Sequence, residues 1–148
     1  MDIVLSPDFK EFLKLLKGHN IRYLLIGGYA VGYHGYPRAT NDMDIWVPLD
    51  PVTAEQITAA LIEFGFDTPQ LSKELFLKEG SIIRMGNAPI RIEIFTAIPG
   101  LNFDECYNQR IVDEVDGTEV NIISLEQLKI NKKASGRHKD LDDLENLP

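Results

Sequence analysis

Hydrophobic positions recur along the chain with two periods, one typical of helices and one typical of strands. Phe9, Phe12 and Leu16 share one face of a helix, and Ser6 ahead of them is a residue type favoured at helix starts. Apolar residues at every second position, as in residues 90–95, instead indicate a strand. In the first half of the chain this predicts a helix over 7–18, a strand over 21–26, a helix from 27 to about 35, a strand over 42–47 and a helix over 51–65. A short helix over 71–78 and a hairpin of strands 82–85 and 90–95 around Gly86-Asn87 follow. The last elements are a helix from Asn102 to 110, a hairpin around Asp116-Gly117, a helix from Ser124 into the 130s, and a final amphipathic turn with Leu141, Leu144 and Leu147.

This order of elements predicts one α/β (α+β) domain over residues 1–148, in which a small mixed β-sheet is flanked by helices. A chain of 148 residues has room for one core but not for two. The sequence contains no internal repeat, no low-complexity tract and no linker long enough to separate domains.

Composition and charge exclude several classes of protein. Hydrophobic residues make up 44% of the chain and charged residues 26%, which excludes a disordered or collagen-like chain. No apolar stretch approaches the roughly 18 residues of a membrane span, and the first ten residues do not resemble a signal peptide. The net charge of −8 argues against a protein that coats nucleic acid. Because Cys106 is the single cysteine, we expect no intrachain disulfide and a reducing, cytoplasmic location.

Two aspartates on the predicted strand over 42–47 form the first candidate site. Side chains alternate along a strand, so Asp42 and Asp44 point to one face. Neighbouring carboxylates repel each other, and a divalent cation such as Mg²⁺ removes this repulsion because it prefers oxygen ligands. The alternative is a solvated strand end, where aspartates are common.

The glycine pair Gly27-Gly28 adds a second candidate feature. It follows a buried strand and opens a helix, where free backbone N–H groups bind anions and glycine lets phosphate oxygens approach closely. A tight turn is the alternative interpretation. Tyr29 stands where the second glycine of a dinucleotide-binding motif would be, and no Gly-Lys-Ser/Thr follows as in a P-loop. A phosphate cradle and a carboxylate pair on successive elements are what metal-assisted nucleotidyl transfer requires.

A third carboxylate is expected from the strand over 90–95. Its isoleucines alternate with Arg91 and Glu93, so Glu93 lies on the polar side of the strand. If this strand pairs beside the aspartate strand, Glu93 can reach the same metal. An exposed surface strand, with Glu93 and Arg91 in solvent, is the alternative.

The glycine pair, the 13 residues after it and the D-x-D that follows resemble the DNA polymerase β-like nucleotidyltransferase superfamily. The chain is most similar to minimal bacterial members related to abortive-infection (AbiEii-type) nucleotidyltransferase toxins. The resemblance runs over LLIGGYAVGYHGYPRATNDMDIWV, RMGNAPIRIEIFTAIPG and SLEQLKINKKASGRHKDLDDLENL. It implies a nucleotidyltransferase-like domain that binds an NTP through Mg²⁺ and moves a nucleotide monophosphate to an acceptor.

The resemblance also implies roles for individual residues. Gly27 and Gly28 would hold the triphosphate, and Asp42 and Asp44 would hold the metal. Glu93 would be the third ligand and would activate the acceptor hydroxyl. Many members have a serine where this chain has Gly28, so phosphate binding here would rest on backbone N–H groups. Many also have an aspartate where this chain has Glu93, which is one methylene longer.

Further nucleotide-binding residues are implied on either side of these motifs. Arg38 and Thr40 match residues that recur in the small members, and Arg38 could bind a phosphate through two N–H groups. Near the C-terminus the toxins use a Lys and an Asp, for which Lys132, Lys133 and Asp140 are candidates, with Lys132 preferred. The alternatives are a surface arginine and a solvated, salt-bridged helix.

These observations lead to a functional hypothesis with two alternatives. The first is an Mg²⁺-dependent nucleotidyltransferase that modifies a tRNA, another RNA or a protein and belongs to a toxin–antitoxin pair with a partner protein. The second is a non-catalytic interaction module that retains the fold. The third is a DxD sugar transferase, for which the glycine pair has no explanation.

Overall fold

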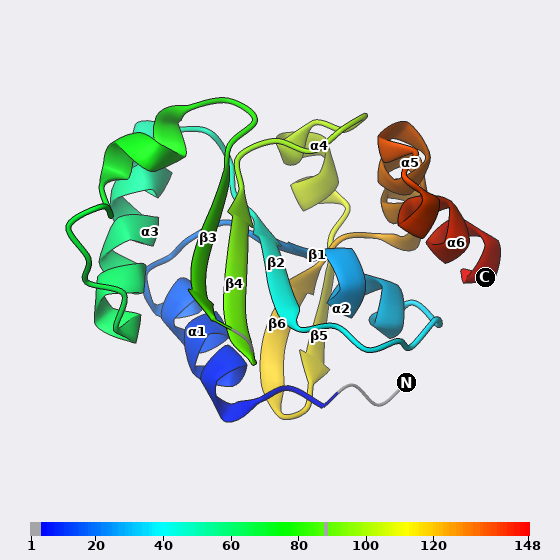
Figure 1. Cartoon of the computed structure of the whole chain (residues 1–148), viewed down its shortest axis with the longest axis horizontal. Coiled ribbons are helices and arrows are strands. Elements are labelled where there is room, and N and C mark those ends of the chain that lie inside the picture. The colour runs from blue at the N-terminus through cyan, green and yellow to red at the C-terminus, as the bar shows by residue number, and fades with distance from the viewer. Residues whose placement is uncertain (1–3, 88) are drawn as a thin grey trace.

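Helices pack on both sides of one mixed β-sheet in the computed structural model, which describes residues 4–87 and 89–148 (Figure 1). The elements are α1 (Pro7–Gly18), β1 (Leu24–Ile26), α2 (Gly27–Tyr33), β2 (Asp42–Trp46), α3 (Pro51–Phe64), the 3₁₀ helix η1 (Lys73–Leu77), β3 (Ile82–Asn87), β4 (Ile90–Phe95), α4 (Phe103–Asn108), β5 (Ile111–Val115), β6 (Thr118–Ile122), α5 (Leu125–Ser135) and α6 (His138–Asn146). The strand order is β3-β4-β2-β1-β6-β5. This mixed α+β architecture confirms the predicted fold class.

Strand pairing brings together the segments predicted to carry the site. β1 pairs antiparallel with β2 and parallel with β6, and β2 pairs parallel with β4. The outer strands β3 and β5 form hairpins with β4 and β6. The strands β2 and β4 therefore lie side by side, next to the corner between β1 and α2.

Four helices begin where their capping residues predict. The N-cap side chains accept a hydrogen bond from the backbone N–H three residues later; they are Ser6, Asp50, Asn102 and Ser124. The predicted capping box before α5 is half formed. The Gln127 backbone N–H donates to the Ser124 hydroxyl as expected, but the Gln127 side chain accepts from that same hydroxyl (3.2 Å) and not from the Ser124 backbone. The helix starts thus follow from local hydrogen bonding alone.

Element bounds differ from the prediction in the less regular parts. The strand predicted over 21–26 begins at Leu24, and the short helix predicted over 71–78 is the 3₁₀ helix η1. The β3–β4 hairpin is present, but residue 88 of its turn lies outside the described residues, as do residues 1–3 of the segment considered for a signal peptide. No helix among the described residues is both long and apolar enough to span a membrane.

The core fills one face of the central strands. Met43 and Ile45 of β2 and Ile92 and Ile94 of β4 are fully buried, and they alternate with the carboxylate residues. In Figure 1, α1 and α3 lie on one side of the sheet and α2, α5 and α6 on the other. This burial fixes the strand register, because a slip of one residue would turn the carboxylates into the core.

The last helix, α6, buries charge where the sequence suggests an apolar face. Leu141 is exposed, Leu144 is half-buried, and Leu147 is buried just beyond the helix. Asp140 and Asp143 are almost completely buried instead. The predicted amphipathic turn is the helix α6, but its face toward α5 is occupied by ion pairs and Leu141 lies in solvent.

Candidate active site

The parallel pairing of β2 with β4 places the three candidate carboxylates on one face of the sheet. Asp44 lies directly opposite Glu93, and Asp42 lies opposite Arg91. Paired residues of neighbouring strands point to the same face, so Arg91 shares this face with the acids. The sheet thus places the three carboxylates on neighbouring strands, as a shared metal site requires.

Two of these carboxylates face arginines of the β3–β4 hairpin. Arg91 donates to both Asp42 oxygens, from Nε at 2.6 Å and from Nη2 at 3.1 Å. Arg84 Nε lies 3.4 Å from Glu93 Oε1. Across residues 4–87 and 89–148, no group of three His, Cys, Asp or Glu side chains is arranged to hold a metal ion. The acids are adjacent, but two of them are neutralised by arginine in this arrangement.

Asp44 has no such partner. Its Oδ1 is buried and accepts no hydrogen bond from any described residue. Burial, followed by the charges of Glu93 and Asp42, raises the pKa of Asp44 to about 7. The two hydrogen bonds from Arg91 lower the pKa of Asp42, whereas burial and the neighbouring Asp42 raise that of Glu93. A buried carboxylate oxygen without a donor is a group that a bound cation would satisfy, so this donor set fits a hard divalent ion.

The glycine corner, Gly27-Gly28, is shaped by close contacts with these residues. Gly27 has a φ of 67°, and a Cβ there would lie 2.1 Å from Asp44 Oδ2. A Cβ on Gly28 would lie 2.8 Å from the Thr40 hydroxyl and 3.4 Å from Arg38 Nη1. Neither glycine can be replaced without moving a neighbouring side chain. The corner therefore brings Asp44, Thr40 and Arg38 against bare backbone.

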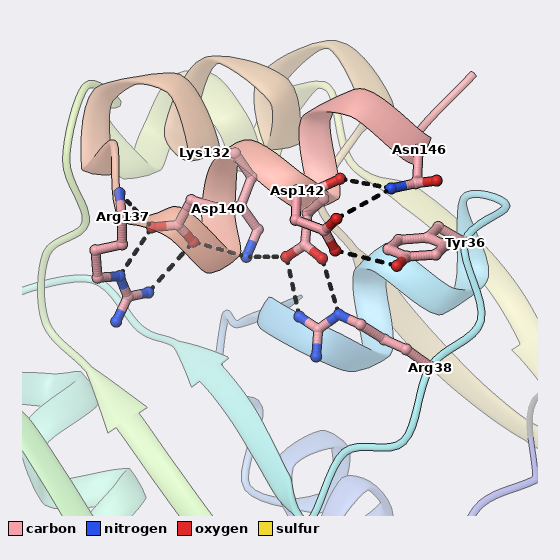
Figure 2. A network of polar contacts seen from close by, with 8 residues as sticks. Tyr36, Arg38, Lys132, Arg137, Asp140, Asp142 and Asn146 are labelled. Carbon is pink, nitrogen blue, oxygen red and sulfur yellow. Dashed lines mark hydrogen bonds and ion pairs between the residues drawn. The ribbon is translucent and has the colours of Figure 1, made fainter.

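The opposite wall is a buried network of charges from α5, α6 and the segment before β2 (Figure 2). Lys132 Nζ lies 3.2 Å from Asp140 Oδ1 and 3.0 Å from Asp143 Oδ2. Arg38 donates to both Asp143 oxygens, at 2.8 and 2.9 Å. The Lys132 side chain is 6% exposed and the Asp143 side chain 0%. The alternative of a solvated helix face is therefore wrong for Lys132.

Outer contacts complete this network and tie α6 to the rest of the domain. Arg137 Nε donates to Asp140 Oδ2 at 2.8 Å while most of the Arg137 side chain stays in solvent. The Tyr36 hydroxyl donates to Asp142 at 3.1 Å (Figure 2). Because Tyr36 and Arg38 both bond to α6, this helix anchors the segment between α2 and β2.

A pocket of about 310 Å³ lies between the glycine corner and the charged wall. Its size is at the lower end of the range typical for small-molecule sites. Five of the eight predicted site residues line it: Gly27, Gly28, Arg38, Asp44 and Lys132. Thr40 lies behind Gly28, and Asp42 and Glu93 lie beside Asp44 on the sheet.

Sequence reasoning named Asp140 as a candidate but missed Arg91 and Asp143 as partners of the site residues. Arg91 was detectable, because strand alternation puts it on the face of Glu93. Asp143 was detectable in part, since a spacing of three places it on one helix face with Asp140. Nothing in the local sequence indicates that this face is buried, or that Asp143 meets Arg38 from 105 residues away.

Comparison with known proteins establishes the fold and the family of the chain. A crystal structure of a Thermotoga maritima protein, provisionally described as a nucleotidyltransferase, matches 96% of this chain and 93% of its own, with 18% identity and a TM-score of 0.65. That of an antigenic nucleotidyltransferase-like protein from Paracoccidioides brasiliensis matches 96% and 76%, with 19% identity and a TM-score of 0.56. That of the lincosamide antibiotic adenylyltransferase LnuA, bound to lincomycin, matches 97% and 96%, with 16% identity and a TM-score of 0.62.

At these identities the solved structures establish the shared fold alone. No curated protein matches the sequence. One family model, described as nucleotidyl transferase of unknown function (DUF2204), matches residues 6–148. Since this match covers nearly the whole chain, the chain belongs to the DUF2204 family of nucleotidyl transferases.

Proposed function

We propose that this protein is an Mg²⁺-dependent nucleotidyltransferase that moves a nucleotide monophosphate from an NTP to an acceptor hydroxyl. The acceptor oxygen would attack the α-phosphorus, the bond to pyrophosphate would break, and the hydroxyl proton would be released. The observation that carries this proposal is the orphaned Oδ1 of Asp44, buried beside Glu93 and against the glycine corner. Burying an ionised carboxylate without a hydrogen-bond donor costs free energy, and a bound cation would offset that cost.

Asp42, Asp44 and Glu93 are the residues that would hold the ion. Bound Mg²⁺ would polarise the phosphate and lower the pKa of the acceptor hydroxyl. Arg91 and Arg84 would first leave Asp42 and Glu93. Both arginine side chains are substantially exposed (39% and 66%), and solvent screens such pairs strongly. These arginines therefore hold the acids only weakly against a divalent ion.

The charged wall offers donors to the phosphates. Lys132 Nζ pairs with Asp140 and Asp143, and among the described residues no third group takes the remaining N–H of its ammonium. Arg38 spends Nε and Nη2 on Asp143, while Nη1 lies near Gly28. Two fixed cations with spare donors beside bare glycine backbone are suited to bind a triphosphate and to stabilise departing pyrophosphate.

The biological acceptor belongs to the proposal as well. We propose an RNA, such as a tRNA, or a protein as acceptor, and a role in a toxin–antitoxin pair. Both rest on the resemblance to AbiEii-type toxins. Inducing the protein in growing bacteria should arrest growth, and the Asp44→Asn variant should not. Equal growth with both proteins would contradict the toxin role but not the enzymatic one.

Label transfer tests the enzymatic proposal. The full chain is incubated with each α-³²P-labelled NTP, Mg²⁺ and total cellular RNA or protein. We expect labelled acceptor with the unaltered protein and at least a hundredfold less with Asp44→Asn. Asp104→Asn, an exposed aspartate that pairs with Arg22, is the matched control and should transfer normally.

The alternatives predict other outcomes of the same experiment. NTP binding without transfer to any acceptor would favour the non-catalytic module. Binding of a nucleotide sugar in preference to every NTP would favour the DxD sugar transferase. Either result would overturn nucleotidyl transfer as the function.

A further inference from the structure

The residues proposed to bind the phosphates line only part of the pocket. Four apolar residues, Ile82, Phe95, Ile98 and Pro99, also line it and are called the apolar shelf here. Ile82 and Phe95 are directly paired across β3 and β4. Phe95 lies two residues beyond Glu93, about 7 Å along the strand and on the same face. The shelf is thus an apolar part of the lining two residues along β4 from Glu93.

One polar side chain faces this shelf from α5 in a fixed orientation. Asn131 lines the pocket, and its Nδ2 donates to the Pro99 carbonyl oxygen at 3.1 Å. A carbonyl oxygen only accepts, so the amide nitrogen must be the atom that faces it. The Asn131 Oδ1 is left as an acceptor, and no hydrogen bond among the described residues uses it.

The turn that positions Pro99 is packed tightly against α5. Gly100 has a φ of 83°, and a Cβ there would lie 2.8 Å from the Ala134 Cβ and 3.7 Å from Ile130. The bare backbone of Gly100 therefore lets the turn approach the helix. This contact holds the Pro99 carbonyl within reach of Asn131, so the acceptor is oriented before any ligand binds.

We infer that this part of the pocket is a nucleobase site in which Asn131 selects adenine and cytosine, through the N6 amino group of adenine or the N4 amino group of cytosine. The inference rests on the proposed function, because it assigns the base of the NTP. The shelf suits the apolar face of a base ring. Adenine and cytosine present an amino donor at the edge where guanine and uracil present a carbonyl acceptor. A fixed acceptor such as Asn131 Oδ1 binds the former and repels the latter.

Nucleotide affinity measured by calorimetry tests this inference. The full chain is titrated with ATP, CTP, GTP and UTP in the presence of Mg²⁺. We expect ATP and CTP to bind about tenfold more tightly than GTP and UTP, which is the effect of about one net hydrogen bond. In Asn131→Ala this preference should vanish, because ATP and CTP lose a hydrogen bond and bind more weakly while GTP and UTP lose a repulsion and bind more tightly.

Two further variants separate the base site from general effects. Asn146→Ala removes an exposed asparagine of α6 outside the pocket and should keep the preference. Ile82→Ser alters the half-exposed edge of the shelf and should weaken all four nucleotides alike. Tight binding without base preference, or a preference that Asn131→Ala leaves intact, would overturn the inference while leaving the proposed function standing. No binding of any NTP would overturn both.

Discussion

The glycine corner and the α5–α6 pair line the same pocket but are built on different principles. At the corner, Gly27 and Asp44 contact each other across two strands that are antiparallel neighbours and close in sequence. In the α5–α6 pair, Lys132 and Asp143 are held together with Arg38, which comes from the other end of the chain. A site built from short-range geometry leaves a motif in the sequence, whereas a buried ion network leaves only a run of charges.

Removing the centre of the charged wall should have the largest effect on stability. Asp143→Ala leaves the buried Lys132 and the half-buried Arg38 without their shared partner, and we expect the free energy of unfolding to fall by about 3–5 kcal/mol. Urea denaturation measures this loss. Asp142→Ala, which removes exposed contacts to Tyr36 and Asn146, is the matched control and should cost less than about 1 kcal/mol. Similar losses in the two variants would show that the wall is not cooperative.

A smaller loss of stability, with complete loss of function, is expected at the corner. Gly27→Ala adds backbone strain and forces the Asp44 carboxylate away, so we expect about 2–3 kcal/mol of destabilisation and no metal-dependent NTP binding. Gly117→Ala is the control, because Gly117 also has a positive φ of 78° but open space around it. It should lose about 1 kcal/mol and bind NTP normally. Normal NTP binding by Gly27→Ala would refute the close approach as the basis of the site.

The pH dependence of the free energy of unfolding should distinguish the glycine corner from the charged wall without any substitution that alters packing. In metal-free protein the pKa of Asp44 is raised from 3.8 to about 7, so the folded state binds the extra proton between these values. Stability should therefore fall as pH rises from about 4 to 7, by at most about 1.4 kcal/mol per pH unit. The raised pKa of Glu93 acts in the same direction above pH 4.5, whereas the lowered pKa of Asp42 acts below pH 3.8.

Asp44→Asn removes this titration. Urea denaturation in EDTA at pH 5 and pH 7.5 should show a smaller difference in Asp44→Asn than in the unaltered protein. Added Mg²⁺ should reduce the difference in the unaltered protein, because a bound cation favours the ionised acid. An equal pH dependence in both proteins would mean that Asp44 ionises normally.

The smallest expected effect concerns the arginine that faces the acids. Arg91→Ala frees Asp42 and removes a charge that competes with the metal, so Mn²⁺ should bind a few-fold more tightly. Arg22→Ala, at an arginine that pairs with Asp104 away from the pocket, should leave Mn²⁺ affinity unchanged. Paramagnetic titration of Mn²⁺ measures both. Weaker Mn²⁺ binding in Arg91→Ala would show that Arg91 supports the site rather than competing with it.

Much of the architecture was predictable because its signals are local. The cap at Ser6 and the turn at Asp116-Gly117 are each specified by a few adjacent residues. The face shared by Asp42 and Asp44 follows from strand alternation alone. The bounds of β1 were less predictable, because apolar residues such as Ile21 pack into the core without joining the sheet.

The sequence by itself determined the fold class, the glycine corner and the acids on one strand face, since turn chemistry and side-chain periodicity act over a few residues. Only the tertiary structure decided that β4 pairs with β2, that Arg91 donates hydrogen bonds to Asp42, and that Lys132 is buried between two aspartates of α6. These outcomes depend on which surfaces pack against each other and are thereby buried from water. The cost of burying a charge, and the partner that offsets it, are properties of the packed domain and not of any segment of its chain.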